Sequence, residues 1–368
     1  MAERFTALYV HVPFCAAKCD YCAFYSVAGA PSELRRAYRE RIERELASVA
    51  RRCDSLDSIY VGGGTPSSLD VQELRRLLEA IRRTFDLTPG AEFTVECNPG
   101  SVSEPKADAL AEAGVNRVSL GVQSFRPHLL RAVGRRAGPF DLEHVLDALR
   151  GRGIVNLGVD MIYAIPGQTM AEWREDVERA CALGISHLSA YELTLHEGTP
   201  LAEPGVQAAD EDLAVEMWHA VADVAGRAGL RRYEVSNLAV PGQECRHNQD
   251  VWHGRAYVGC GPAASSFDGE LRWTNPSDLR RWLDDAPPER DPLPRPRRAA
   301  ELLALGLRTV RGWGRHEFRA RTGFDYLSLR GDVLTRLAAE GLILLADDGV
   351  RPTERGLLFA DMMERSLL

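Results

Sequence analysis

Lysine is almost missing from this chain, because Lys18 and Lys106 are the only two and arginine supplies the rest of the 45 basic residues. The 53 acidic residues outnumber them, so the formal net charge is -8 at pH 7. Nucleic acids and anionic lipid surfaces attract proteins with an excess of positive charge. The composition therefore predicts no nucleic-acid partner and no general attraction to a membrane surface.

Long apolar segments are missing as well. No stretch approaches the roughly 20 apolar residues that cross a bilayer, and the opening residues MAERFTALYVHVPF lack the small-residue cleavage site of a secretion signal. Eight cysteines in 368 residues are too few for a disulfide scaffold. These absences predict a cytoplasmic protein in a reducing compartment.

Short apolar runs alternate with amphipathic stretches through the first half of the chain, and this alternation predicts the fold. Helices are expected over Ser32–Ala50 and Asp70–Thr84, the second with Asp70 and Glu73 placed as a capping box. Because each parallel strand pair needs a crossover helix, six strands predict an α/β fold with an open, partial (β/α)6 TIM-type barrel. Its site should lie at the carboxyl ends of the strands. The six predicted strands are Thr6–Val12, Ser58–Val61, Glu92–Glu96, Arg117–Val122, Leu157–Tyr163 and His187–Leu193.

The alternation of predicted strands and helices becomes less regular after residue 200. We therefore expect three regions: a barrel core at 1–200, an extension or linker region at 201–290, and a C-terminal domain at 291–368. A helix is expected over Asp210–Gly229, and five prolines in Pro287–Pro296 indicate a linker. Helices near Arg315–Thr322 and Leu327–Glu340, followed by the hairpin sequence GLILLADDGVRPTERG, predict a winged-helix-like α+β domain. The second helix is not basic enough to hold DNA phosphates, so a packing role is expected.

Three cysteines within eight positions carry the strongest chemical signal. Cys15, Cys19 and Cys22 have C-x3-C-x2-C spacing directly after the first strand. Three thiolates on one loop can bind three irons of a 4Fe–4S cluster and leave one iron without a protein ligand. Structural zinc normally needs four ligands, and no second close cysteine pair follows. His11 is expected to point away from the loop, so the spacing favours the cluster.

The cysteine loop resembles that of the radical S-adenosylmethionine (SAM) superfamily. The resemblance implies that SAM binds the open iron and that one electron cleaves it to a 5′-deoxyadenosyl radical. That electron would come from a donor such as flavodoxin or ferredoxin. The aromatic residues Phe14, Tyr21 and Phe24 lie between and beside the cysteines, where we expect them to limit solvent access.

Polar and glycine residues end successive predicted strands, where a barrel assembles its site. Within the superfamily, GGGTPSSL, ECNPG, RVSLGVQSF, DMIYAIPGQT and YELTLHEGTP resemble the coproporphyrinogen III oxidase-like branch. The resemblance implies SAM contacts at ten positions, in which a glycine-rich backbone receives the methionine end and an arginine suits its carboxylate. These positions are Tyr9, Phe14, Tyr21, Gly63, Gly64, Thr65, Glu96, Gln123, Arg135 and Asp160.

One position distinguishes the members of this branch. Oxygen-independent coproporphyrinogen oxidases carry a fourth cysteine two residues after the third, and here that residue is Phe24. The chain instead resembles the HemW family, which is regarded as haem chaperones. ECRHNQDVWHG is similar to an H-N-x-x-Tyr/Trp-Trp segment of that family, although Val251 replaces the usual aromatic residue. The resemblance implies haem as cargo, recipient haem proteins as partners, and a peripheral membrane contact through those recipients.

Haem iron takes His, Cys, Met or Tyr as an axial ligand. We therefore treat His247 and Cys245, which lie together near Trp252, as candidate haem ligands, His247 first. Three alternatives remain open at this stage. They are radical decarboxylation of coproporphyrinogen III, a radical methyltransferase or cyclopropanase of the same branch that uses a second SAM, and a metal-free scaffold without enzymatic activity.

Overall fold

The computed structural model describes residues 4–135, 141–203 and 209–368. Its centre is a sheet in which six parallel strands stand in the order β1-β4-β5-β6-β7-β8. This confirms the partial barrel that the sequence predicts. The six strands are β1 (Phe5–Val12), β4 (Cys53–Gly63), β5 (Leu87–Cys97), β6 (Arg117–Gln123), β7 (Asn156–Tyr163) and β8 (His187–Glu192).

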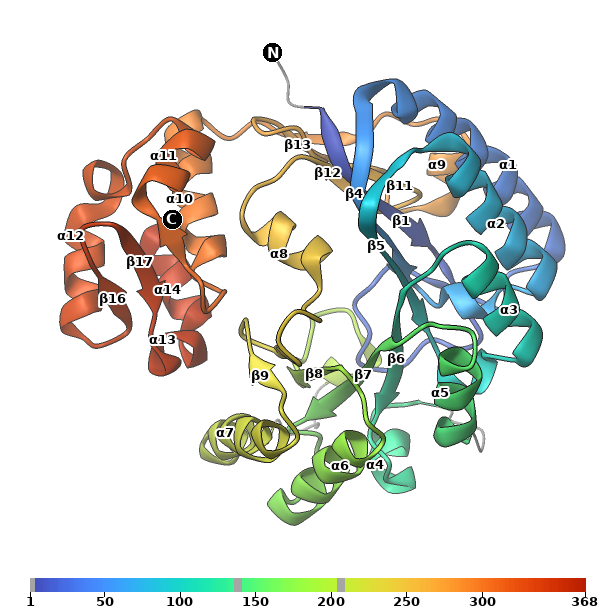
Figure 1. Ribbon diagram of the computed structural model, residues 1–368, viewed down its shortest axis with the longest axis horizontal. Helices are drawn as coiled ribbons and strands as arrows, with labels where there is room; N and C mark the ends of the chain where they lie inside the picture. The colour runs from blue at the N-terminus through green and yellow to red at the C-terminus, as the bar shows by residue number, and fades with distance from the viewer. Residues whose placement is uncertain (1–3, 136–140, 204–208) are drawn as a thin grey trace.

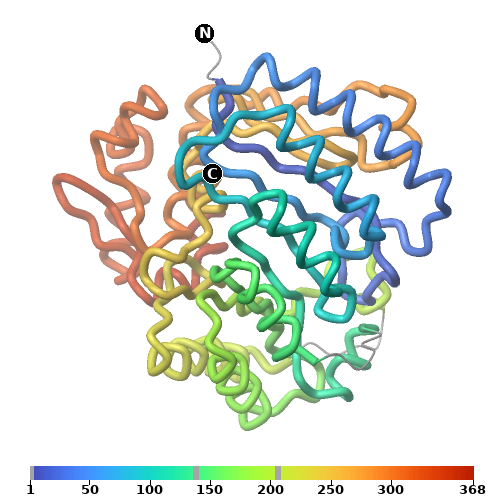
Figure 2. Tube along the Cα trace, turned by 45° about the vertical axis from the view of Figure 1, so that its right-hand side comes forward, coloured from blue at the N-terminus to red at the C-terminus, as the bar shows by residue number. Residues whose placement is uncertain are grey.

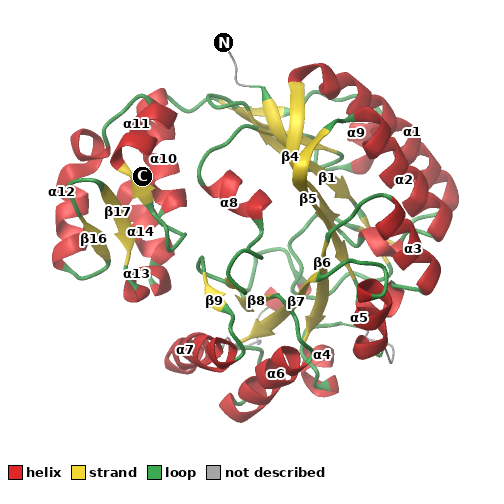
Figure 3. Cartoon of the chain, in the orientation of Figure 1, coloured by secondary structure: helices red, strands yellow, loops and turns green. Residues whose placement is uncertain are grey.

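Helices cover the convex side of this sheet (Figures 1 and 3). Each presents its apolar stripe to outward-facing strand residues, and together these side chains form the main core. Asp70 and Glu73 do form the predicted capping box at the start of α2. The helices of the barrel are α1 (Ser32–Val49), α2 (Val71–Thr84), α3 (Glu104–Glu112), α4 (Pro127–Ala132), α5 (Leu142–Arg150), α6 (Met170–Ala182) and α7 (Glu211–Arg227).

The sheet continues beyond both ends of the six-stranded core. On the β1 side, β11 (Tyr257–Cys260) pairs parallel to β1, and β12 (Ser265–Phe267), β13 (Arg272–Thr274) and β14 (Glu289–Asp291) follow antiparallel. On the β8 side lie β10 (Asn237–Ala239) and β9 (Arg231–Arg232). The proline-rich stretch therefore contains a strand, which corrects its interpretation as a linker. Two short strands, β2 (Phe14–Cys15) and β3 (Val27–Ala28), pair separately.

Helix α8 (Arg246–Trp252) lies on the concave side of the sheet, between its two ends (Figure 1). It contacts β4 and, on its other side, α10 of the C-terminal region. The short helix α9 (Leu279–Leu283) lies against α1. Because α8 covers the concave face, it fills the side on which the partial barrel stays open.

The C-terminal region is a compact α+β unit with its own apolar cluster, seen beside the barrel in Figure 2. Two helices precede a hairpin as predicted, and a third short strand completes a sheet in the order β15-β17-β16. The elements are α10 (Arg295–Gly306), β15 (Trp313–Gly314), α11 (Arg315–Thr322), α12 (Tyr326–Ala339), β16 (Ile343–Leu345), β17 (Gly349–Pro352), α13 (Glu354–Leu358) and α14 (Ala360–Leu367). Within the described residues, no helix combines the length and apolar character that a bilayer span requires.

Candidate cofactor site at the carboxyl ends of the strands

The cysteine loop, residues 15–22, crosses the carboxyl end of the barrel. The backbone N–H of Asp20 donates to the Val133 carbonyl at 3.1 Å, and Leu201 N–H donates to the Asp20 carbonyl at 2.9 Å. These two bonds fix the loop to segments that follow β6 and β8. The loop therefore spans the end of the barrel where the sequence predicts the site.

The three thiols of this loop lie close to one another. Burial raises the pKa of Cys22, and the charges of Cys19 and Cys15 raise it further. The Phe24 N–H donates to the Cys22 sulfur, and Cys15 Sγ lies 3.5 Å from Thr65 Oγ1. Within the described residues, no three His, Cys, Asp or Glu side chains are grouped closely enough to hold a metal ion. Three neighbouring thiols on one loop fit a cluster of several irons.

His11 contributes to the packing under the loop. Its Nδ1 lies 3.0 Å from Tyr9 Oη and its Nε2 lies 2.9 Å from the Tyr25 carbonyl, so both ring nitrogens have partners. The imidazole also lies against Gly63. His11 is therefore held as a structural residue beside the glycine turn.

The glycine turn, residues 62–64, lies directly under the cysteine loop. Gly64 N–H donates to the Val12 carbonyl at 2.8 Å and Thr65 N–H to the Phe14 carbonyl at 2.7 Å. Gly63 has φ +102°, and a Cβ there would collide with the His11 ring. Because any side chain at Gly63 would displace the His11 ring, glycine is required for the turn to keep this backbone path. This arrangement fits the methionine end of SAM.

Glu96 connects this turn to the interior of the barrel. Its carboxylate accepts the Tyr60 hydroxyl at 2.7 Å and the Gly63 N–H at 3.0 Å. Burial raises the pKa of Glu96 to about 7, and the nearby Asp160 charge adds to that effect. Tyr9 lies in the same group, and burial followed by the Glu96 charge raises the pKa of its hydroxyl. Glu96 can therefore change its protonation state near neutral pH.

Asp160 is held in place by two hydroxyl groups from neighbouring strands. Ser119 and Ser189 both donate to Asp160 Oδ1, at 2.9 Å and 2.6 Å. Because both hydroxyls bond one oxygen, the carboxylate has a defined direction toward the concave face. Gln123 ends β6 with φ +72°, a conformation that turns the chain at this strand end.

Arg135 joins the cysteine loop to β6. Its guanidinium donates to the Gly121 carbonyl and hydrogen-bonds Cys19 and Tyr21. Burial raises the pKa of Cys19 and of Tyr21, while the Arg135 charge opposes both shifts. Arg135 therefore places a positive charge at the cysteine loop.

The structure groups most of the residues predicted for SAM. Tyr9, Glu96 and the glycine turn are linked to one another, while Asp160 and Arg135 stand at neighbouring strand ends. Phe14 differs, because its ring is fully buried against Tyr38 at 5.2 Å between centroids, and only its backbone carbonyl reaches the turn. In this conformation the Phe14 side chain packs in the core.

Four polar residues of the site escaped the sequence analysis. They all lie on the inner strand face within the last few residues of their strands: Tyr60 on β4, Ser119 on β6, and Ser189 and Tyr191 on β8. Burial raises the pKa of Tyr191, yet its side chain is 42% exposed, so it faces open space inside the barrel. Period-two alternation is the available signal, since Tyr60 and Ser119 each lie an even number of residues before a predicted site residue, Gly64 and Gln123 respectively.

The candidate haem ligands lie at the start of α8, buried against β4 and β5. Cys245 is 0% exposed and His247 is 4% exposed. The Cys245 thiol donates to Glu92 at 3.5 Å, and His247 Nδ1 lies 3.0 Å from Ser58 Oγ. A haem iron reaches neither atom unless α8 moves, so their role as ligands stays a prediction.

Comparison with known proteins agrees with this geometry. Residues 9–180 match the Radical SAM superfamily and residues 293–359 match the HemN C-terminal domain. The haem chaperone HemW of Lactococcus lactis is 34% identical over 379 residues, covering 100% of this chain and 99% of that protein. HemW of Bacillus subtilis is 31% identical and covers 96% of both.

A solved structure shares the whole fold. Coproporphyrinogen III oxidase (HemN) from Escherichia coli superposes with a TM-score of 0.84 at 22% identity, covering 99% of this chain and 90% of that one. The fold is therefore shared, and the family matches over residues 9–180 and 293–359 show that it is that of a radical SAM protein. Within that superfamily, the full-length similarity shows that the chain belongs to the HemW family. A 4Fe–4S cluster and SAM are the cofactors of the superfamily, and the cysteine loop and glycine turn fit them.

Proposed function

We propose that this protein is a haem chaperone, which binds haem and delivers it to haem proteins, and that it carries a 4Fe–4S cluster and SAM. The observation that carries this proposal is the similarity to HemW proteins over the whole length of both chains. Phe24 at the position of a fourth cysteine agrees with it, because the oxygen-independent coproporphyrinogen oxidases have cysteine there.

In this proposal, each group of residues at the site has its own role in binding the cofactors. Cys15, Cys19 and Cys22 would hold the cluster, which would supply the electron for reductive cleavage of SAM. The glycine turn binds the methionine end through backbone atoms, and Arg135 pairs with its carboxylate. Glu96 and Asp160 accept hydrogen bonds from the amino group or ribose hydroxyls. Tyr60 fixes the Glu96 carboxylate by donating its hydroxyl, and Tyr9 holds the neighbouring His11 ring.

Further partners belong to the same proposal. An electron carrier such as flavodoxin or ferredoxin reduces the cluster, and the recipients of haem supply any contact with a membrane. The compartment is the cytoplasm, where reducing conditions keep the eight free cysteines and the cluster intact.

Haem transfer tests the function. The anaerobically reconstituted protein should bind haem, which shifts the Soret band of the haem. It should pass the haem to apomyoglobin over minutes. SAM cleavage should be slow and should not be coupled to this transfer. Decarboxylation of coproporphyrinogen III under reducing conditions would contradict the proposal in favour of an oxidase. Formation of S-adenosylhomocysteine with a methylated product would contradict it in favour of a methyltransferase.

A further inference from the structure

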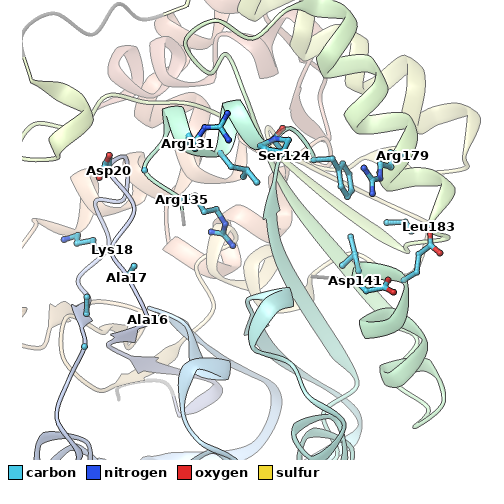
Figure 4. A pocket seen from close by; sticks show the side chains of 18 residues that line it. Ala16, Ala17, Lys18, Asp20, Ser124, Arg131, Arg135, Asp141, Arg179 and Leu183 are labelled. Carbon is cyan, nitrogen blue, oxygen red and sulfur yellow. The ribbon is translucent and has the colours of Figure 1, made fainter. Parts of the chain in front are cut away.

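A large cavity lies beside the cysteine loop, outside the network formed by Glu96 and Asp160. Its volume is about 1430 Å³, more than the roughly 300–1,000 Å³ of ordinary small-molecule sites. Residues of the cysteine loop form one side, and α6 with the start of α5 forms the other, with Ser124, Arg131 and Arg135 between them (Figure 4). We call this space the loop cavity.

Three cations of the loop cavity have no acidic partner. Within the described parts of the chain, Lys18, Arg131 and Arg179 form no ion pair, although the chain as a whole is acidic and pairs many of its arginines. Arg179 instead lies over the Phe125 ring, 4.4 Å from the centroid. Lys18 is one of only two lysines in the chain and stands between two cluster cysteines. These side chains are available to an anionic ligand.

Two of the three acidic residues around the loop cavity have other roles, and the third, Glu143, is exposed and forms no ion pair within the described residues. The Asp141 carboxylate accepts the His144 N–H at 3.1 Å and caps α5. Asp20 lies against the backbone of Gly134, where it helps to seat the cysteine loop. The cavity therefore keeps more unpaired positive than negative charge.

Apolar surface makes up much of the remaining wall. Ala16 and Ala17 belong to the cysteine loop, while Leu130, Leu142 and Leu183 come from three different helical segments. Apolar side chains on both sides, together with cations around and between them, suit an apolar molecule that carries carboxylates. Haem has this chemistry, since its macrocycle is apolar and its two propionates are anionic.

We propose that the loop cavity is the haem-binding site of this protein, in which apolar residues of the cysteine loop and helices α4–α6 hold the macrocycle and the unpaired cations hold the propionates. This inference rests on the proposed function and gives it a location. Arg135 contacts both Cys19 and the loop cavity, so the bound macrocycle would lie next to the cluster loop.

The described lining contains no His, Cys, Met or Tyr residue. The macrocycle is therefore held by its apolar faces and its carboxylates, and the iron stays free to accept a ligand from a recipient protein. Metal-free protoporphyrin IX should then bind about as tightly as haem. Its dimethyl ester, which lacks both charges, should bind at least about tenfold more weakly.

The test is porphyrin titration of the full-length, cluster-loaded protein and its variants. Arg131→Ala/Arg179→Ala should weaken both haem and protoporphyrin IX by about tenfold or more, because each substitution removes a charge-assisted hydrogen bond. Arg131→Lys/Arg179→Lys keeps the charge and should retain most of the affinity. The matched control Arg76→Ala/Arg227→Ala removes two exposed helix arginines elsewhere and should leave both affinities unchanged.

Three other outcomes would contradict the proposal that haem binds in the loop cavity. In the first, Arg131→Ala/Arg179→Ala keeps its porphyrin affinity, and His247→Ala loses haem binding but still binds protoporphyrin IX. This result would place the haem site at α8 and leave the proposed function unchanged. Unchanged porphyrin affinity with slower cluster reduction by reduced flavodoxin would assign the loop cavity to the electron carrier. Failure of the unsubstituted protein to bind haem or protoporphyrin IX would instead refute the proposed function itself.

Discussion

At the scale of single residues, the close approach of backbone and side chains around the glycine turn controls what can bind there. Gly63 combines a left-handed φ with contact to His11, so it has neither the conformational nor the spatial freedom to carry a side chain. Gly114 has a similar φ of +81° but open space around its Cβ position. The two glycines therefore separate the effect of backbone conformation from that of crowding.

Gly63→Ala should lower SAM affinity by at least about tenfold, because the turn must shift to relieve the collision with His11. Gly114→Ala should lower the free energy of unfolding by only about 1–2 kcal/mol and leave SAM affinity unchanged. Isothermal titration of SAM into both cluster-loaded variants measures the difference. Equal SAM affinities in the two variants would show that the turn does not receive the ligand.

The protonation of Glu96 gives SAM binding a pH dependence. Burial raises the pKa of its carboxyl to about 7, so the ligand-free site is mostly protonated at pH 6 and mostly ionised at pH 8. Because the ionised form accepts hydrogen bonds from SAM, affinity should rise about tenfold across this range. Glu96→Gln should lose that part of the profile and keep only the titration of SAM itself. If the SAM affinities of Glu96→Gln and of the unsubstituted protein changed with pH in parallel, Glu96 would not contact SAM.

At the scale of elements, α8 owes its position to one carboxylate of the neighbouring sheet. Glu92 of β5 accepts the N–H groups of Arg246 and His247, at 2.9 Å and 3.1 Å, and the thiol of Cys245. Asp278, by contrast, caps α9 with a single bond to the Arg281 N–H. Glu92 therefore satisfies several buried donors at once, which ordinary caps do not.

Glu92→Ala should destabilise the protein by about 2–4 kcal/mol, since it leaves buried donors without partners. Asp278→Ala should cost about 1 kcal/mol. Urea unfolding measures both, and hydrogen exchange should show faster opening of α8 in Glu92→Ala alone. Similar losses in the two variants would mean that Glu92 acts only as an ordinary cap.

The elements also show how far the sequence predicts the structure. The six core strands and α1, α2 and α7 follow from apolar periodicity and caps, and the cysteine spacing predicts where the site lies. Strands β9–β14 have two to four residues each, too few for a periodic pattern, and β14 stands among prolines. The burial of His247 depends on contact with Ser58, 189 residues away, which no local pattern records.

At the scale of the whole molecule, a network of charges joins the sheet to the C-terminal region. Arg298 at the start of α10 is buried and pairs with Asp291 of β14 and with Glu301. Arg272 of β13 reaches the same two carboxylates. The sheet extension and α10 therefore share one partly buried network centred on Arg298, which holds the two parts together.

Arg298→Ala should lower the free energy of unfolding by about 1.5–3 kcal/mol, because it removes charge-assisted hydrogen bonds from a buried guanidinium while Arg272 still pairs with both carboxylates. Arg311→Ala removes an exposed pair with Glu317 and should cost less than about 1 kcal/mol. Urea unfolding of both variants, loaded with cluster to the same extent, checks this contrast. A small loss for Arg298→Ala would show that the network adds little to the junction.

The most direct test of the account is Mössbauer spectroscopy of the anaerobically reconstituted, ⁵⁷Fe-labelled protein with and without SAM. Three cysteine ligands predict four irons per chain, of which one changes its spectrum when SAM binds, and Cys22→Ala should lose the cluster. A mononuclear metal, or four irons that stay equivalent when SAM is added, would contradict the account.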